Sequence, residues 1–251
     1  MNRIGILSKA KTVSKLKHGN LWVLYGKSNT GKTYISSTFP KPLLYVRIGD
    51  DGLGTISRMP GDIRAISIKS VDQLNDIFEE LENDTTYKTV VFDTFSLLVS
   101  EWTSEKVLQK NKRMTQQLWG DLKIDQEEAV KKAQRLSHHK IVVLTCHESQ
   151  DSIEGMEDEI APEVRPSVSK GARTYLEGMA NFGLHTTKIT KEVTKNGVTK
   201  DVVKYAADIG PNPYYWTKLQ IDPSIKVPAR IINPTYEKIM AIVNAETKQE
   251  E

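Results

Sequence analysis

The sequence has few of the features that stabilise an extracellular chain or place a chain in a membrane. It contains one cysteine, Cys146, so no disulfide can form within the chain, and we expect a reducing compartment such as the cytoplasm. No apolar run reaches the roughly eighteen residues that a membrane helix needs, and the first residues do not read as a signal peptide. We therefore expect a soluble protein without a membrane partner, in which Cys146 lies in a buried strand.

The chain also lacks a strong excess of charge of either sign. Its 35 Lys and Arg residues nearly balance 32 Asp and Glu residues, for a formal net charge of +3. A nucleic-acid site would therefore have to be a local cluster of cations. One such run is residues 1–18, which hold five basic residues and no acid, either as a mobile arm or as a solvated lead-in to the fold.

One stretch indicates a ligand. Residues 26–33 read GKSNTGKT and match the phosphate-loop pattern G-x-x-x-x-G-K-[ST], between an apolar run at 21–25 that predicts a strand and a predicted helix start at 34–37. Lys32 would reach the β- and γ-phosphates, and the Thr33 hydroxyl would hold Mg²⁺. The alternative is a glycine-rich turn that carries Lys and Thr by chance. The predicted nucleotide contacts are Gly26, Lys27, Ser28, Asn29, Thr30, Gly31, Lys32, Thr33 and Tyr34.

Polar residues follow three further predicted strands. Residues 87–93 form an apolar strand that ends in Asp93, as in a Walker B segment, where the carboxylate would hold Mg²⁺ or, alternatively, cap the next helix. Asp50 and Asp51 follow the strand predicted at 43–48, and His147 ends the one predicted at 140–148. Because the carboxyl ends of parallel strands line the ligand crevice, these residues should meet beside the nucleotide.

The remaining elements follow from helical and alternating patterns. A capping box at Ser70 opens an amphipathic helix, and residues 95–138 are helical by pattern, with a basic stretch from Lys106 to Arg113. A long loop then holds seven acids between Glu148 and Glu163. A short helix is predicted at 174–181, a strand around 214–216, and a last helix capped by Asn233 and Pro234.

Two β-prone runs at 182–193 and 198–207 meet at Asn196 and Gly197, which is a strong hairpin signal. The hairpin is rich in lysine, which would make a basic ribbon for nucleic acid or would serve only to keep edge strands unpaired. The candidate DNA-binding residues are Lys188, Lys191, Lys195, Lys200 and Lys204.

These patterns predict an α/β fold, with a P-loop core in which a mostly parallel sheet lies between helices, and a C-terminal β-hairpin extension. The order of the polar residues at the strand ends resembles that of the RecA-like branch of P-loop ATPases. We expect a basic lead-in at 1–19, the ATPase core with the hairpin at 20–210, and a strand, an irregular segment and a helix at 211–251. AAA+ ATPases usually place Glu directly after the Walker B Asp, whereas Thr94 follows Asp93 here, which disfavours a typical AAA+ engine. Neither a guanine-reading N-K-x-D motif nor a transporter L-S-G-G-Q motif is present.

The phosphate loop, Asp50-Asp51-Gly52, Asp93-Thr94 and the segment from Thr145 to Glu148 together resemble the small phage RecA-like ATPases of single-strand annealing and recombination, over roughly residues 20–210. The resemblance implies an ATP- and Mg²⁺-dependent ATPase, with Asp51 as the catalytic carboxylate, Asp50 as its alternative and His147 as the γ-phosphate sensor. It implies single-stranded DNA as a partner, a homo-oligomeric ring or filament, and a single-strand-binding protein as a further partner. A cation from a neighbouring subunit would complete the site, and the candidates are Arg165, Lys170 and Arg173.

Two other functions stay open at this stage. One is a ring helicase or helicase-loader motor, and the other is a nucleotide-dependent binding switch with little turnover.

Overall fold

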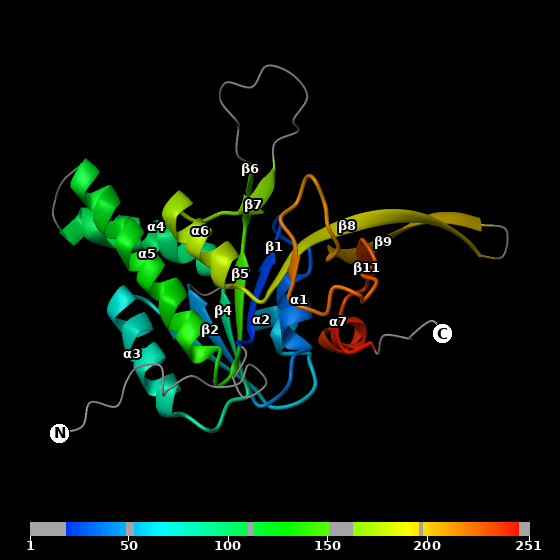
Figure 1. Ribbon diagram of the computed structural model, residues 1–251, viewed down its shortest axis with the longest axis horizontal. Coiled ribbons are helices and arrows are strands. Elements are labelled where there is room, and N and C mark those ends of the chain that lie inside the picture. The colour runs from blue at the N-terminus through cyan, green and yellow to red at the C-terminus, as the bar shows by residue number, and fades with distance from the viewer. Residues whose placement is uncertain (1–18, 49–52, 110–112, 151–162, 196–197, 246–251) are drawn as a thin grey trace, which may run out of the picture.

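The computed structural model describes residues 19–48, 53–109, 113–150, 163–195 and 198–245 (Figure 1). Its centre is a nine-stranded sheet in the order β11-β9-β8-β1-β5-β4-β2-β3, with β10 paired to β8 off this path. The six strands from β8 to β3 run parallel. They are β1 (Leu21–Tyr25), β2 (Leu43–Ile48), β3 (Ile63–Ile68), β4 (Thr89–Asp93), β5 (Ile141–Cys146) and β8 (Phe182–Lys195).

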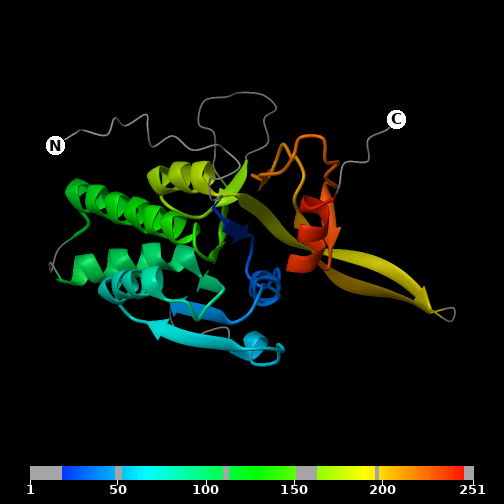
Figure 2. The same cartoon turned by 60° about the horizontal axis from the view of Figure 1, so that its bottom comes forward.

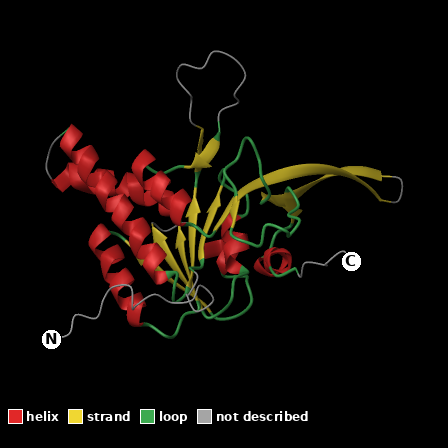
Figure 3. Ribbon diagram, viewed as in Figure 1, coloured by secondary structure: helices red, strands yellow, loops and turns green. Residues whose placement is uncertain are grey.

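Helices cover both faces of this sheet (Figure 3). One face carries α3 (Val71–Asn83), α4 (Phe95–Gln109), α5 (Gln116–Leu136) and α6 (Lys170–Met179), and the other carries α1 (Lys32–Ser37), α2 (Leu53–Ile56) and α7 (Tyr236–Val243). Successive residues of a strand point to opposite faces, so Val23 packs in the first core and Trp22 in the second. Strands buried on both faces read as continuous apolar runs, which is why β1, β2, β4 and β5 are visible in the sequence.

The hairpin joins β8 to β9 (Val198–Asp208) and projects from the body of the molecule (Figure 2). Two short strands widen its root, since β10 (Lys218–Leu219) pairs with β8 and β11 (Arg230–Ile232) pairs with β9. The segment after residue 210 is therefore continuous with the main sheet. A separate two-stranded sheet forms from β6 (Glu148–Gln150) and β7 (Val164–Pro166).

The predicted fold class is confirmed, with corrections in detail. Strand β3 was not predicted, because most of its side chains are exposed and form no apolar run. Helix α6 begins at Lys170 and not at Thr174, and α7 is capped by the Thr235 hydroxyl, which accepts from the amide of Lys238. Residues 214–216 form no strand, and only Tyr215 makes an isolated bridge to Val164.

Several predictions fall on residues outside the described ranges: the basic lead-in at 1–18, Asp50 and Asp51, most of the acidic loop (151–162) and the hairpin turn at Asn196 and Gly197. None of the helices in the described part of the chain combines the length and apolar character that a membrane span requires.

Candidate functional site

The phosphate loop follows β1 at the carboxyl edge of the sheet. Gly26 and Gly31 have φ angles of 153° and 93°, in the region that side chains rarely adopt. A Cβ atom on Gly26 would lie 2.3 Å from the carbonyl oxygen of Thr186, so this position also has no room for one. Helix α1 begins at Lys32 with no side chain capping its first turn. Its first N–H groups are thus available to an anion, which is what the phosphate-loop motif predicts.

Lys32 lies inside this loop. Its ammonium donates to the carbonyl oxygens of Gly26 at 2.8 Å and Lys27 at 2.7 Å, and the residue is only 7% exposed. Burial lowers the pKa of Lys32, and the nearby Asp93 carboxylate opposes that effect. Lys32 is thus buried because the phosphate loop wraps two of its own carbonyl groups around the ammonium.

Thr33 and Asp93 are brought together from α1 and β4. The Thr33 hydroxyl donates to Asp93 Oδ2 at 2.9 Å, and the Thr145 hydroxyl, from β5, donates to Asp93 Oδ1 at 2.5 Å. Mg²⁺ prefers oxygen ligands such as hydroxyl and carboxylate groups. Water and substrate phosphates usually complete the coordination shell of the ion. These two residues therefore fit the predicted role of holding Mg²⁺ beside the phosphates.

His147 comes directly after β5, the strand between the phosphate-loop strand and the Walker B strand. Its amide donates to Ser96 Oγ at 2.9 Å, which fixes the backbone at this point. Burial, and then the charge of Lys32, lowers the pKa of His147 below its ordinary value of 6.5, so the neutral imidazole prevails at pH 7. Its predicted role as γ-phosphate sensor stays a prediction.

These groups line the same cavity, which has a volume of about 670 Å³. Lys32, Thr33, Asp93 and His147 all border it, as do Ser28, Asn29, Gly31 and Tyr34 of the predicted nucleotide contacts. Tyr205, from β9, also lines it and was not predicted as a site residue. An exposed aromatic at the root of a hairpin is a weak signal, because nothing local in the sequence places that root beside the phosphate loop.

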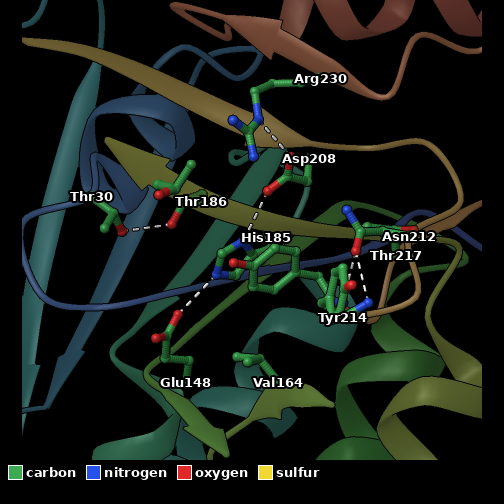
Figure 4. Close-up of polar contacts among 12 residues, drawn as sticks. Thr30, Glu148, Val164, His185, Thr186, Asp208, Asn212, Tyr214, Thr217 and Arg230 are labelled. Carbon is green, nitrogen blue, oxygen red and sulfur yellow. Dashed lines mark hydrogen bonds and ion pairs between the residues drawn. The ribbon is translucent and has the colours of Figure 1, made fainter. Parts of the chain in front are cut away.

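The root of the hairpin contacts the phosphate loop directly. The hydroxyl oxygens of Thr186, in β8, and Thr30 lie 2.7 Å apart (Figure 4). The neighbouring His185 is buried between two carboxylates, with Glu148 Oε2 at 2.8 Å from Nε2 and Asp208 Oδ2 at 3.0 Å from Nδ1. Arg230 of β11 donates to the other oxygen of Asp208 at 2.6 Å. This chain of contacts joins the segment after His147 to β8, β9 and β11.

The predicted trans-acting cations differ in what they contact. Arg165 forms ion pairs with Glu163 and Glu177 of its own chain. Arg173 donates to Ser149 Oγ and to the carbonyl oxygen of Val168, both at 3.3 Å. Lys170 lies exposed at the start of α6. Of the three, Lys170 would need the least rearrangement to reach another subunit.

The hairpin separates its charges between its two faces. In the register of β8 and β9, Lys191 pairs with Val202, Val193 with Lys200, and Ile189 with Lys204. Residues that pair directly share a face, and successive residues along a strand lie on opposite faces, so Lys191, Lys200 and Lys204 lie on one face. We name these three residues the lysine face. The opposite face carries the directly paired acids Glu192 and Asp201.

The other two predicted DNA-binding lysines are placed differently. Lys188 pairs with Tyr205, on the face opposite the lysine face, and its ammonium lies 5.8 Å from the centre of the Tyr205 ring. Lys195 is the last residue of β8, and its side chain is not among those described. In the basic stretch of α4, Lys106 forms an ion pair with Asp125 of α5.

The comparison with protein families agrees with this geometry. A model of the family described as AAA domain matches residues 18–218, which is most of the chain. Among solved structures, the chain is similar to the flagellar accessory protein FlaH from Methanocaldococcus jannaschii, with 16% identity, 77% of this chain and 78% of that chain covered, and a TM-score of 0.41. No significant match was found among curated proteins. Thr94 follows Asp93 in this chain, at the position where a typical AAA+ ATPase has Glu. The chain therefore belongs to the AAA-domain family and is a P-loop ATPase.

Proposed function

We propose that this protein hydrolyses ATP with Mg²⁺ and acts on single-stranded DNA in phage recombination, by strand annealing or strand exchange. The phosphate loop, Lys32, Thr33 and Asp93 form the hydrolytic site, and Asp51 polarises the attacking water. The single observation that carries the DNA part of the proposal is the separation of charge on the hairpin. A nearly neutral chain that binds a polyanion must gather its cations on one surface, and the lysine face does this.

The composition of the lysine face also indicates how DNA would bind. Between the lysines lie Ile189, Val193 and Val202, and no aromatic residue shares this face in the described part of the hairpin. Aromatic side chains would contact the bases by stacking, whereas lysines contact the backbone phosphates, which carry no sequence information. Binding through this face should therefore be insensitive to DNA sequence and should weaken steeply with salt.

The proposal includes a homo-oligomer, a ring or a filament, with each nucleotide site completed by a cation from the next subunit. Lys170 is the first candidate because it is exposed, and Arg173 and Arg165 follow. A cation supplied in trans is worth about 10³-fold or more in turnover in other phosphoryl-transfer classes. Mixing Lys32→Ala subunits with Lys170→Ala subunits tests this, since restored activity in the mixture requires a shared site.

The experiment that tests the function is ATP turnover measured with and without single-stranded DNA. We expect basal hydrolysis, stimulation by single-stranded DNA of any sequence, and hydrolysis reduced by about 10²-fold or more in Lys32→Ala under both conditions. ATP binding with neither turnover nor DNA binding would favour a nucleotide-dependent switch. Directional unwinding of a forked duplex would favour a helicase or loader motor over recombination.

A further inference from the structure

We propose that Tyr205 binds the base of the nucleotide, with its ring as an aromatic platform on the hairpin side of the phosphate loop. This inference rests on the proposed function, because it takes the cavity to hold a nucleoside triphosphate. It concerns a part of the cavity lining to which the phosphate-binding residues do not contribute.

The sheet order places Tyr205 on the side of the phosphate loop where the nucleoside would lie. Along the sheet, β5 and β4, which deliver His147 and Asp93, lie on one side of β1, and β8 and β9 lie on the other. His185 pairs with Tyr25, the last residue of β1, and Tyr205 pairs with Lys188, three residues further along β8. At about 3.3 Å per residue, Tyr205 lies about 10 Å beyond the edge of the sheet where the phosphate loop begins. A nucleotide whose phosphates lie between the loop and Asp93 can thus extend its nucleoside toward Tyr205.

The ring of Tyr205 contacts the loop and is open to the cavity. A Cβ atom added to Gly31 would be 3.0 Å from Cδ1 of Tyr205, so the ring packs close to the backbone of this glycine. The residue is nevertheless 39% exposed and borders the cavity. A ring that is fixed along one side and exposed to a ligand cavity is well suited to stacking against a base.

The position of the ring is preorganised. The carbonyl oxygen of Tyr205 accepts a hydrogen bond of 2.8 Å from the amide of Asn233, and the strand is paired on both sides by β8 and β11. The ammonium of Lys188, 5.8 Å from the ring centre, is close enough for a cation–π contact. A platform held before the ligand arrives costs little ordering entropy on binding.

Tyr34 is the competing residue, because it borders the same cavity and is 38% exposed. It follows Thr33 in helix α1, so it is adjacent in the sequence to the residues that would bind the phosphates and Mg²⁺. The two tyrosines can be separated by experiment, since only a residue that stacks on the base should distinguish ATP from a ligand that has phosphates but no base.

The test is calorimetric titration of the full chain with ATP and with inorganic tripolyphosphate. We expect Tyr205→Ala to weaken ATP binding by about 5- to 100-fold, as the loss of one base–aromatic stack predicts, and to leave tripolyphosphate binding within about twofold. Tyr205→Phe should keep the affinity for ATP, because it keeps the ring. Val203→Ala is the matched control, since Val203 lies two residues away on the same face of β9 and is exposed.

Equal weakening of both ligands in Tyr205→Ala would indicate that the ring only supports the loop, and would overturn the inference. No change for ATP, or loss of base-dependent affinity in Tyr34→Ala alone, would overturn it as well. A wild-type protein that binds neither ligand would be a different result, because it would also refute the nucleotide site.

Discussion

The parallel core and the projecting hairpin are built under opposite constraints. Every residue of β1 is buried, as are the first four of β4, whereas the outer residues of β8 and β9 are mostly exposed. In the core, packing determines the side chains, so only residues at strand ends such as Asp93 and His147 are available for chemistry. In the hairpin, packing determines little, so the gathering of Lys191, Lys200 and Lys204 on one face, opposite a face with two acids and Lys188, needs another explanation.

The root of the hairpin contacts the phosphate loop of the core. Gly26 and Thr30 of the phosphate loop contact Thr186 of β8, and Gly31 contacts Tyr205 of β9. The root of the hairpin is therefore part of the wall of the nucleotide site, although it lies more than 150 residues from the loop in the sequence. Chemistry should depend on the core, polyanion binding should depend on the outer hairpin, and the root of the hairpin joins the two at the phosphate loop.

The largest expected effect is that of Lys32→Ala. It should reduce ATP hydrolysis by about 10²- to 10³-fold, because it removes the ammonium that stabilises charge on the transferring phosphoryl group. Lys200→Ala, in the hairpin, is the control and should retain basal hydrolysis. Because Lys32 is buried and donates to two loop carbonyls, unfolding of both variants in urea should be compared. Full hydrolysis by a folded Lys32→Ala protein would contradict the assignment of ATP hydrolysis to the core.

A smaller effect is expected for Asp51→Asn, which should keep ATP binding and lose turnover by roughly 10²-fold, the usual contribution of a general base. The matched variant is Asp50→Asn, one residue away in the sequence. Turnover and ATP affinity measured for both variants assign the base. A loss confined to Asp50→Asn would shift the assignment by one residue.

The smallest effect concerns His147 and pH. Since its pKa in the folded protein lies below 6.5, the unfolded chain binds more protons as the pH falls below that value, and the folded state loses stability. This contribution is present above pH 6.5 and is lost as the pH falls through the lowered pKa. Urea unfolding at pH 7 and pH 5 should show a smaller loss of stability in His147→Gln than in the wild type. An equal loss in both proteins would contradict the lowered pKa.

The features of the core were easier to predict from the sequence than those of the hairpin. The buried strands, the phosphate loop and Asp93 were predictable because their signals are local: apolar runs and a motif of fixed spacing. Strand β3 was missed because its exposed side chains give no apolar run. Tyr205 was missed because its place in the cavity depends on β8 pairing with β1, a contact between residues far apart in the chain.

The hairpin was predictable only in part. Its existence was predictable from the Asn196-Gly197 turn signal, but the face of each lysine depends on the pairing register, since a shift of one residue moves every side chain of a strand to the other face. The register separates Lys188 from the lysine face and places it beside Tyr205. Composition alone had grouped all five lysines together.

The most direct test of the account is the salt dependence of single-stranded DNA binding by a variant in which Lys191, Lys200 and Lys204 are replaced by Ala. The control should remove the same charge elsewhere, as in Arg58→Ala, Lys69→Ala and Lys226→Ala combined, because these three residues are exposed and lie outside the hairpin. Each phosphate contact contributes about 0.7 to the slope of log affinity against log salt for a single strand. We predict that the slope flattens by up to about 2 in the lysine-face variant and changes little in the control, with basal ATP hydrolysis retained in both. An unchanged affinity and slope in the lysine-face variant would contradict the assignment of DNA binding to the hairpin.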